Sequence, residues 1–560
     1  MIHLLNNLTK IQMKKTYILS MLLLVSCIGF AQFTATTYRG AFAPAPTPMW
    51  TDTWTNFDPQ NTVYPATNVN VSANITADTH WTAGNTYYLK GQIYVKNNVT
   101  LTIDAGVVIK GDKTATGAGL FVTKGSKINA IGTATNPIVF TSDQAPGQRI
   151  TGDWGGVILL GKASYNINNG INNIEGIPAT ADTEFGGGLT PNDDDSSGTL
   201  KYVRIEFAGY VYAPNAEING LTFGAVGRGT TIDYVQVSHA NDDSYEWFGG
   251  TVNCKHLVAF RGLDDDFDTD NGFSGNVQFC LGIRDPQVSD NPTISTSNGF
   301  ESDNNATSDP ATPFTACVFS NVTIVGPHYR VTLPNGGTIA NGFGRAAQLR
   351  RNSKQKIFNT IFMDYNNGLH VDGVTTETNA LNNDLKFKNN IMASNTSGKV
   401  AYVNATGNNA SFNAATWYAN NNNITVATST GLLIKPYDLT NAQNYLGLDY
   451  RPSSSSIAAS GASFTDTSLA TQDFTAVISE FFLTVYPNPY TSSFKLNFTS
   501  TNDAKVAVAI YDFSGKLLEI RTIRYEDINN QVMGSGYIPG VYVVVLKQGN
   551  INKSVRVIKN

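Results

Sequence analysis

The chain has 560 residues, of which only 14% are charged, against about 25% in ordinary soluble domains. Its formal net charge of −5 is small for this length. These values exclude the basic footprint of a nucleic-acid-binding protein and the polybasic patch of a membrane-surface protein. Asn, Thr, Ser and Gly carry the polar surface instead. Short polar and β-branched side chains favour strands and tight turns over helices, so the composition predicts an all-β protein.

Residues 1–31 have the pattern of a secretory signal peptide. Two lysines follow Met13, a mostly apolar run covers 17–30, and Ala31 closes a small-residue cleavage site. The run is shorter than the roughly 20 apolar residues that span a bilayer, and no later segment is apolar enough, so we expect no transmembrane segment in the mature chain. Cys27 ends a lipobox-like Leu-Val-Ser-Cys, so lipid anchoring is the alternative.

Residues 32–85 are rich in Pro and Trp and show no repeat, and we expect them to cap the N-terminal end of the structure that follows. From about residue 86, short apolar strands alternate with Gly, Asn and Asp. A period near 20 with two or three strands per unit indicates a solenoid, and no amphipathic helix intervenes. The sequence therefore predicts a right-handed parallel β-helix over 86–465, with a large β-sandwich or propeller as the alternative.

The repeat is most regular early in the chain and less even later. The first four anchor strands follow one another at intervals of 18 to 19 residues. The later intervals run from about 21 to about 44 residues, which indicates loops inserted into some turns. The later anchors begin at Tyr202, Tyr234, His256, Val277, Asn321, Asn359 and Asn389.

The mature chain would keep three cysteines, Cys254, Cys280 and Cys317. An odd number cannot pair completely, so the chain is not a disulfide scaffold. Because each lies in or beside an apolar strand, we predict three buried thiols. One disulfide with a free thiol is the alternative.

The pattern changes after a linker at 466–484. Residues 485–560 contain short alternating strands and a basic end, which predict a small Ig-like β-sandwich. The ordered motifs are Tyr-Pro-Asn-Pro (Tyr486, Pro487, Asn488 and Pro489), a Tyr-Asp-x-x-Gly-Lys turn with Gly515, and Gly-Val-Tyr from Gly540.

This set of motifs resembles the type A C-terminal sorting domain of type IX secretion cargo. The resemblance implies recognition by an outer-membrane translocon. It also implies that the protein is secreted or lies on the cell surface of a Gram-negative bacterium, and that the sorting domain is commonly cut off there. An incidental Ig-like carbohydrate module is the alternative.

The central region also resembles a known group of proteins. The motifs are Gly-Asp-Trp-Gly-Gly at 152–156, Asn-Gly-Leu-Thr-Phe at 219–223 and the acidic segments at 242–250 and 264–270. They resemble an uncharacterised family of secreted parallel β-helix proteins that often carry this sorting domain. The resemblance implies an architecture and a location but no reaction.

Acidic residues gather in two neighbouring units of the repeat. Asp242 and Asp243 precede Asp264 and Asp265 by 22 residues, about one coil, so their side chains should lie one above the other. Like charges about 5 Å apart repel unless a cation or a proton intervenes. Calcium is the natural partner because it takes about six to eight oxygen ligands. The predicted calcium ligands are Asp264, Asp266, Asp268 and Asp270, and further members of the cluster are Glu246, Asp285, Glu301 and Asp303.

Two other interpretations of the acidic residues remain. One is hydrogen-bonded turns with structural aspartates. The other is catalysis, because an inverting glycoside hydrolase needs two carboxyl groups about 6.5–9.5 Å apart and a polysaccharide lyase needs a base beside a cation or an arginine. The sequence lacks the Gly-His-Gly and Arg-x-Lys patterns of pectin hydrolases. The catalytic candidates are Asp242, Asp243, Asp265 and Arg261.

Residues near the acidic cluster are candidates for contact with a glycan. Tyr245 and Trp247 have rings that stack on sugars in other proteins, although packing in the core is the alternative. The basic residues Arg345, Arg350 and Arg351 are candidates for an anionic glycan, with pairing to nearby acids as the alternative.

These features predict an exported β-helix that binds a glycan or another surface and is stiffened by calcium. The second hypothesis is an extracellular polysaccharide lyase or glycoside hydrolase that uses the acidic face. The third is a purely structural surface protein.

Overall fold

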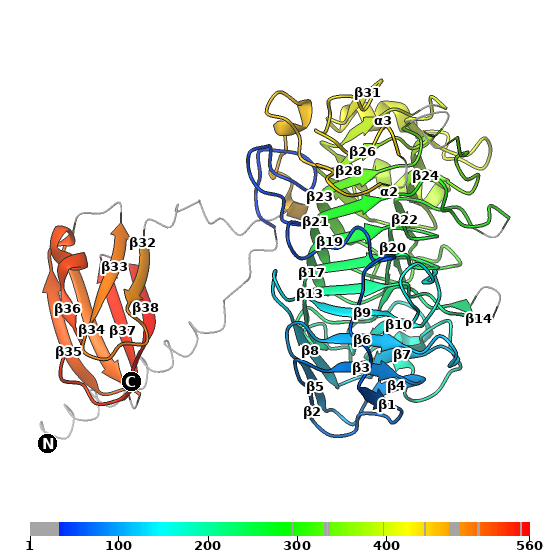
Figure 1. Cartoon of the computed structure of the whole chain (residues 1–560). Coiled ribbons are helices and arrows are strands. Elements are labelled where there is room, and N and C mark those ends of the chain that lie inside the picture. The colour runs from blue at the N-terminus through cyan, green and yellow to red at the C-terminus, as the bar shows by residue number, and fades with distance from the viewer. Residues whose placement is uncertain are drawn as a thin grey trace, which may run out of the picture. The chain divides into compact units, whose positions relative to one another are not determined.

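The computed structural model describes residues 33–469 and 481–560, apart from 214–215, 294, 330–332, 334–335, 396, 442–443, 501–503, 514 and 549–550. The chain forms two compact units that divide between residues 471 and 472. The first is a parallel β-helix and the second an antiparallel β-sandwich (Figure 1). The predicted signal peptide and Cys27 lie outside the described residues.

Each coil of the β-helix has three faces, and each strand pairs in parallel with its equivalents in the neighbouring coils. Face 1 is a sheet of ten strands. They are β4 (Gln92–Val95), β7 (Gly119–Val122), β10 (Gly156–Leu160), β16 (Leu221–Gly224), β18 (Tyr245–Phe248), β20 (Phe267–Asp270), β22 (Phe300–Ser302), β24 (Arg345–Leu349), β27 (Asn367–Val371) and β30 (Ala401–Tyr402).

Faces 2 and 3 are separate strands in the first and last coils and halves of single long strands in the middle. Face 2 contains β2 (Thr79–Trp81), β5 (Thr100–Ile103), β8 (Lys127–Ile131), β25 (Lys356–Phe358) and β28 (Lys386–Lys388). Face 3 contains β1 (Val69–Val71), β3 (Thr86–Leu89), β6 (Val108–Gly111), β9 (Ile138–Ser142), β26 (Ile361–Met363), β29 (Ile391–Ala393) and β31 (Ile424–Val426). The long strands are β13 (Gly198–Glu206), β17 (Thr231–Ser238), β19 (Asn253–Phe260), β21 (Asn276–Ile283) and β23 (Val318–Val325).

One residue in the middle of each long strand bends the chain from face 2 to face 3. These residues have φ between 51° and 61°, a left-handed conformation that non-glycine residues rarely adopt. Their side chains stack from coil to coil, with ring centroids 4.4 Å apart for Tyr202 and Tyr234 and 4.2 Å for Tyr234 and His256. The five bend residues are Tyr202, Tyr234, His256, Phe279 and Asn321.

Alternate strand residues point into the β-helix and form one continuous apolar core. In β18, for example, Tyr245 and Trp247 are fully buried in this core. Cys254, Cys280 and Cys317 are buried and unpaired, which confirms the prediction of three buried thiols. Stacking of coils therefore buries the apolar side chains that no single coil could cover.

The N-terminal segment does not lie where the sequence predicted. The first coil already begins at β1. Phe33 packs beside Phe358 of face 2, and residues 41–57 run along the outer side of face 3 in the middle and later coils (Figure 1, dark blue). Phe42 and Trp54 join one apolar cluster there with the outward-facing apolar residues of β19 and β21, and the ring of Phe57 lies 5.2 Å from that of Phe260. These residues would otherwise expose an apolar patch to water, which explains why the segment covers the flank and not the end.

Insertions extend some turns. The segment after β10 carries η1 (Asn168–Gly170), β11 (Asn172–Asn173) and β12 (Glu184–Phe185), and it packs on the outer side of face 1. Two helices follow face 1 in the last coils, α2 (Val374–Leu381) and α3 (Ala414–Asn420). The remaining short elements of this unit are β14 (Val211–Ala213), β15 (Ala216–Glu217), η2 (Ile457–Ala459) and η3 (Thr467–Leu469).

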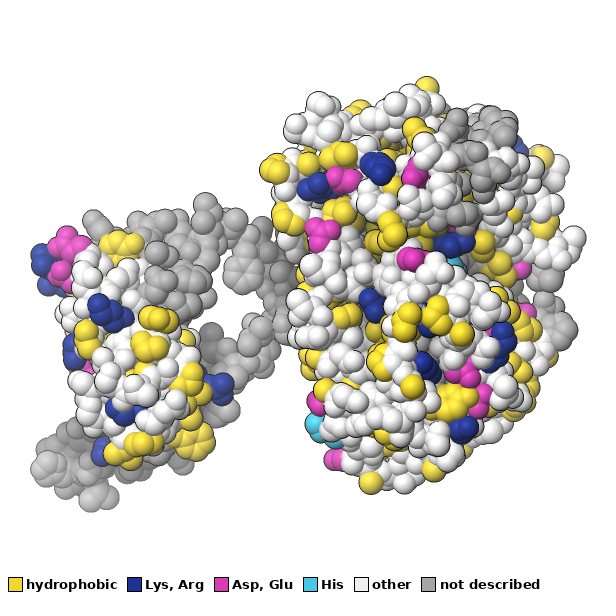
Figure 2. Space-filling model, in the orientation of Figure 1, with side chains coloured by type: hydrophobic (Ala, Val, Ile, Leu, Met, Phe, Trp, Pro, Cys, Tyr) yellow, Lys and Arg dark blue, Asp and Glu magenta, His cyan; other side chains and the backbone are white. Residues whose placement is uncertain are grey.

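Uncharged polar groups cover most of the face seen in Figure 2, with charges scattered among them.

The second unit has two antiparallel sheets around its own apolar core. One sheet contains β32 (Phe481–Tyr486), β33 (Phe494–Ser500) and β36 (Val532–Met533). The other contains β34 (Val506–Asp512), β35 (Leu517–Ile523), β37 (Gly540–Gln548) and β38 (Ile551–Lys559), and η4 (Tyr525–Asn530) precedes β36. This arrangement is the small β-sandwich that the alternating strands predicted.

Candidate functional site

Carboxylates gather where the turns from face 3 to face 1 enter β18, β20 and β22. We call this region the acidic corner. It contains Asp242, Asp243, Glu246, Asp264, Asp265, Asp268, Asp290 and Glu301, together with Glu175 and Glu217 from neighbouring segments.

A ladder of side chains ties the turns of the acidic corner together. Asn219 Oδ1 accepts a hydrogen bond from the backbone N–H of Asp243 at 3.2 Å, and Asp243 Oδ1 accepts one from the N–H of Asp265 at 2.7 Å. Asp265 Oδ1 in turn accepts a hydrogen bond from the backbone N–H of Asn298. Asn298 Oδ1 accepts one from the backbone N–H of Arg345 at 3.0 Å. Asp243 and Asp265 therefore each use one carboxylate oxygen to hold the next coil.

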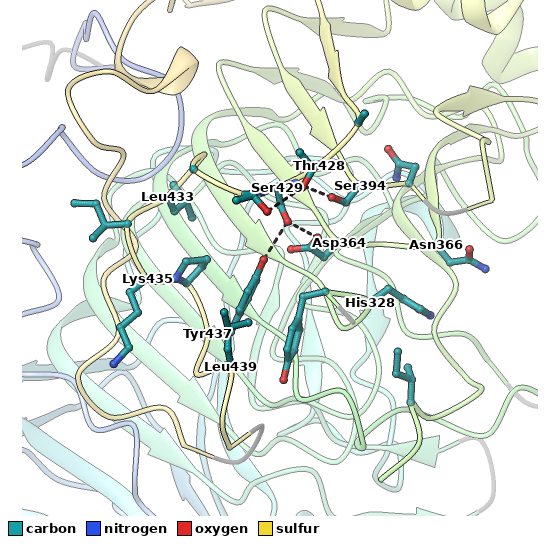
Figure 3. Close-up of a pocket in the computed structure, with 18 residues that line it drawn as sticks. His328, Asp364, Asn366, Ser394, Thr428, Ser429, Leu433, Lys435, Tyr437 and Leu439 are labelled. Atoms are coloured by element: carbon teal, nitrogen blue, oxygen red, sulfur yellow. Dashed lines mark hydrogen bonds between the residues drawn. The ribbon is translucent and has the colours of Figure 1, made fainter. Parts of the chain in front are cut away.

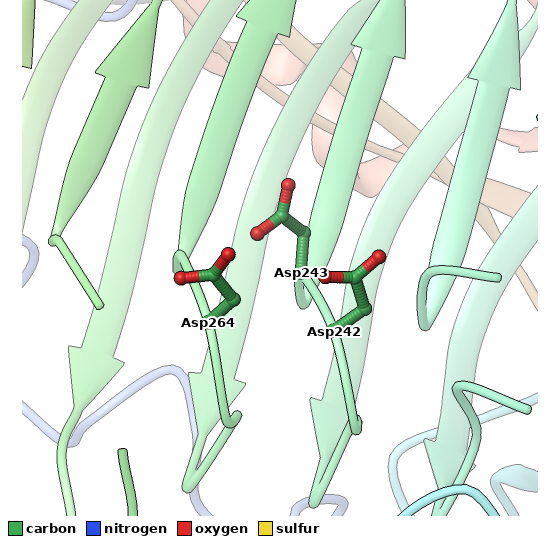
Figure 4. Close-up of side chains that lie close together, drawn as sticks. All are labelled: Asp242, Asp243 and Asp264. Atoms are coloured by element: carbon green, nitrogen blue, oxygen red, sulfur yellow. The ribbon is translucent and has the colours of Figure 1, made fainter. Parts of the chain in front are cut away.

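Two groups of carboxylates are close enough to share a cation. The ligand oxygens of Asp242, Asp243 and Asp264 all lie within 4.8 Å of one another (Figure 4). The oxygens of Asp243, Glu246 and Asp268 form a second group with the same spacing. Since calcium–oxygen distances are about 2.3–2.6 Å, oxygens around one calcium ion lie at most about 5 Å apart. Asp243 belongs to both groups and joins them.

The second group continues along the outer side of face 1. Glu246, Asp268 and Glu301 occupy the same register position in three successive coils. Oδ1 of Asp264 and Oδ1 of Asp268 are buried without a hydrogen-bond partner among the described residues. Such oxygens carry a desolvation cost that a bound cation or proton would offset.

Burial and mutual repulsion make these carboxyl groups weak acids. Burial first, and neighbouring carboxylates second, raise the pKa of Asp242, Asp243, Glu246, Asp265 and Asp268 well above the ordinary values. Burial and Asp290 raise the pKa of Asp264 to about 6. Burial raises the pKa of Glu301 to about 7, although Arg350 opposes the shift. The acidic corner therefore holds more carboxyl groups than its own basic residues neutralise.

A cavity of about 230 Å³ opens beside Asp242 and Asp264. Glu175, Glu217 and Asp290 also line it. Sequence reasoning missed these three because they come from insertions outside the repeat, where no spacing places them beside the coil. It also missed the ladder residues Asn219 and Asn298, which lie 24 residues before Asp243 and 33 residues after Asp265, about one coil in each case.

The structure separates the four predicted calcium ligands. Asp264 and Asp268 belong to different groups of the acidic corner. Asp266 points inward and forms a fully buried ion pair with Arg284, at 3.3 Å between Oδ2 and Nε. Asp270 accepts hydrogen bonds from the backbone N–H and the side-chain amide of Asn271, at 2.6 and 2.7 Å. Asp264 and Asp266 lie in the turn before β20, and only Asp268 and Asp270 lie in the strand. Residues two apart in an extended strand share a face but stand about 6–7 Å apart, so the four carboxylates do not wrap around one ion as they would in a loop.

The catalytic candidates are also divided. Asp242, Asp243 and Asp265 lie together in the acidic corner. Arg261 instead forms an ion pair with Asp285, and its guanidinium lies 5.3 Å from the centre of the Tyr445 ring. It lines a different cavity, beside Phe57 and His239.

The structure contradicts the assignment of Tyr245 and Trp247 to a glycan surface. Both side chains point into the solenoid, and the hydroxyl of Tyr245 donates to the carbonyls of Val235 and Val258 at 2.7 and 3.0 Å. Inward and outward residues alternate along β18, and Glu246 takes the outward position between them. The rings therefore stabilise the core.

The basic residues near this region contact other parts of the protein. Arg350 pairs with both Glu301 and Asp303, and Arg351 lies 2.6 Å from Asp303 Oδ2. Arg345 donates to Tyr402 Oη at 3.2 Å and to Thr296 Oγ1 at 2.9 Å. Arg350 and Arg351 thus lie beside the acidic corner and offset part of its charge.

The sorting motifs lie at the ends of the sandwich strands. Tyr486 is 78% exposed, and the amide of Asn488 joins β38 by accepting from the N–H of Ile558 at 2.9 Å. Gly515 has a φ of 83° in the turn that closes on Asp512, a conformation that suits glycine. Gly540 is the first residue of β37. Pro487 and Pro489 flank Asn488 in the exposed loop between β32 and β33.

The parallel coils and the separate C-terminal sandwich define a β-helix protein with an appended module. The profile of a family described as a pectate-lyase-like β-helix domain matches residues 73–432. The chain belongs to this pectate-lyase-like β-helix family. A family described as the secretion system C-terminal sorting domain matches residues 484–560. Comparison with curated proteins and with solved structures gave no match.

The sorting domain establishes where the protein acts. The chain is a cargo of the type IX secretion system, and it is secreted or attached to the cell surface, outside the outer membrane of a Gram-negative bacterium. In the described part of the chain, no helix has the length and apolar character that crossing a membrane requires.

Proposed function

We propose that this exported β-helix binds calcium in the acidic corner and, with the ion in place, binds a glycan outside the cell. One observation carries the proposal: two groups of three carboxylates, each with ligand oxygens within 4.8 Å, meet at Asp243. The buried, unpartnered oxygens of Asp264 and Asp268 supply acceptors that a divalent cation would satisfy.

The chemistry of the site favours an acidic glycan. The protein oxygens of one group would fill only part of a calcium shell of about six to eight ligands. Carboxylates or hydroxyls of a polysaccharide would complete it. A free anionic polysaccharide would be repelled by the acidic corner, so binding should require the cation.

The proposal predicts calcium binding and calcium-dependent adhesion by the mature chain, residues 32–560. Calcium is titrated by calorimetry into protein freed of metal with EDTA, and sedimentation with insoluble polygalacturonate is compared in calcium and in EDTA. Asp268→Asn should weaken both by about tenfold or more, since it removes one charged ligand. Asp384→Asn is the matched control, because Asp384 pairs with Lys354 on the same β-helix outside the acidic corner. The proposal fails if calcium does not bind, or if Asp268→Asn and the control behave alike.

A polysaccharide lyase is the second candidate, which the pectate-lyase-like description of the family favours. A lyase needs a base near the cation. Arg350 is tied to Glu301 and Asp303, so it neutralises charge there and is poorly placed as a base. An inverting glycoside hydrolase fits less well. Its two carboxyl groups stand about 6.5–9.5 Å apart, whereas the carboxylate oxygens within each group here lie within 4.8 Å of one another.

The two candidates differ in turnover. Incubating the mature chain with polygalacturonate and calcium should leave the concentration of reducing ends unchanged if it only binds. An increase in reducing ends that is lost in Asp268→Asn would replace binding with catalysis at the same corner.

A further inference from the structure

A second and larger cavity lies at the same corner of the solenoid, in its last coils (Figure 3). Its volume is about 800 Å³, within the range of about 300–1,000 Å³ that is typical of small-molecule sites. Its walls come from three successive turns between faces 3 and 1 and from residues 427–439, which follow β31. It shares no lining residue with the acidic corner.

Asp364 is the most distinctive group in this cavity. It follows β26, and only 1% of its surface is exposed. Its Oδ1 accepts a hydrogen bond from Ser429 Oγ at 2.7 Å. Its Oδ2 is buried without a hydrogen-bond partner among the described residues. A ligand that donates to Oδ2 would remove the cost of leaving this oxygen unsatisfied.

The surrounding side chains hold Asp364 in place. Ser429 also lies 3.0 Å from Tyr437 Oη, and its backbone N–H donates to Ser394 Oγ at 2.7 Å. The rings of Tyr329 and Tyr437 stack with centroids 4.2 Å apart. Figure 3 shows Ser429 between Asp364 and Tyr437. The cavity therefore combines a fixed acceptor with a rigid aromatic wall.

The remaining walls indicate a ligand that is neutral and partly apolar. Leu433 and Leu439 contribute apolar surface, and Asn366 and Thr428 contribute uncharged polar groups. Lys435 donates to the carbonyl of Gly447 at 3.3 Å, and Figure 3 shows its side chain pointing away from Asp364. A sugar ring matches this combination, because its C–H face packs on aromatic and aliphatic side chains while its hydroxyls donate to carboxylates.

We propose that this cavity binds a neutral sugar residue, with one hydroxyl donating to Asp364 Oδ2 and the ring lying against the Tyr329–Tyr437 wall. The site is additional to the acidic corner and needs no cation. Burial raises the pKa of the Asp364 carboxyl to about 7, which agrees with a neutral ligand. A small amine is the competing ligand, since it would pair with an ionised Asp364.

The test uses the mature chain in EDTA, so that a cation site does not contribute. Saturation-transfer NMR and calorimetry measure binding of glucose, galactose, mannose, xylose and N-acetylglucosamine, with butylamine as the amine probe. We expect at least one sugar to bind, and Asp364→Asn to weaken it by about tenfold or more because it replaces an acceptor with a donor. Ile434→Trp, at a 46% exposed residue on the rim, should block binding without touching the Asp364 network. Asp384→Asn again serves as the control.

The binding results separate a sugar site from the alternatives. A sugar that binds in EDTA and is lost in both Asp364→Asn and Ile434→Trp supports the site. If Asp364→Asn fails to fold, Ile434→Trp still tests it. Absence of binding by every sugar, binding of butylamine alone, or sugar binding that both variants leave unchanged would overturn the proposal. Failure of calcium binding at the acidic corner would leave this result unaffected.

Discussion

Asp243 Oδ1 accepts a 2.7 Å hydrogen bond from the backbone N–H of Asp265, the residue in the same position one coil later. In the same way, Asn219 Oδ1 accepts from the backbone N–H of Asp243, and Asn298 Oδ1 accepts from that of Arg345. Asparagine and aspartate therefore fill equivalent places in one ladder. The ladder needs only a side-chain oxygen. The negative charge of Asp243 is therefore available for another purpose, and the hydrogen bonds of the ladder can be tested at the neighbouring Asp265.

Substitutions at Asp265 should separate the ladder from the charge. Asp265→Ala leaves the N–H of Asn298 without its acceptor, and we expect the free energy of unfolding to fall by about 1–3 kcal/mol. Asp265→Asn keeps an oxygen at this place, as Asn219 and Asn298 do, so the free energy of unfolding should fall much less. Chemical denaturation in EDTA measures both. Equal losses in the two variants would contradict a role for the ladder.

The effect of calcium on stability should grow with pH. In the cation-free protein the folded-state pKa of Asp264 is raised to about 6 and that of Glu301 to about 7, whereas both are about 4 in an unfolded chain. Between these values the folded chain binds more protons than the unfolded chain, so the free energy of unfolding falls as pH rises from about 4 to about 7. Calcium would offset this loss.

Melting temperatures at pH 5 and pH 8, each with calcium and with EDTA, measure this effect. We expect a larger increase with calcium at pH 8 than at pH 5. Asp268→Asn should reduce the increase at pH 8, and Asp384→Asn should not. An equal increase at both pH values would argue against binding by the acidic corner.

The buried ion pair between Asp266 and Arg284 should be essential to the fold. Arg284 also donates to the carbonyls of Gly262, Asp264 and Asn298. Arg284→Met leaves the Asp266 charge buried and unpaired, so we expect a loss of about 3–5 kcal/mol in the free energy of unfolding.

Arg228→Met is the matched control for Arg284→Met. Its partner Asp194 is exposed, so the loss there should be about 0–1 kcal/mol. Chemical denaturation compares the two variants. Similar losses would show that the buried pair contributes no more than a surface pair.

Removing residues 484–560 should stop export without unfolding the β-helix. The sandwich is a separate unit with its own core, and its family match covers the same residues. We expect the truncated chain to stay in the periplasm, to remain resistant to protease and to keep its melting temperature. Cell fractionation compares it with the full chain. Normal amounts of the truncated chain at the surface would contradict the role of the sorting domain.

The sequence by itself determined the class of fold, the C-terminal domain and the export route. These follow from local patterns: apolar strands recur at about one coil, and the sorting motifs are contiguous. The anchors at Tyr202, Tyr234 and His256 were also visible in the sequence. That each is a left-handed bend between two faces was not, because non-glycine residues in this conformation are stabilised by stacking with the coils above and below.

Only the tertiary structure decided which side chains meet. The 22-residue spacing brought Asp243 beside Asp265, as a repeat requires. Alternation along β18 then sent Tyr245 and Trp247 inward and left Glu246 outside. Asp266, in the turn before β20, points inward to Arg284, whereas Asp268 in the strand lies outside. Glu175 and Asp290 reach the acidic corner, and Ser429 and Tyr437 reach Asp364, from segments outside the repeat. Those contacts depend on how insertions fold over the coils, and long-range packing of that kind leaves no periodic signal in the chain.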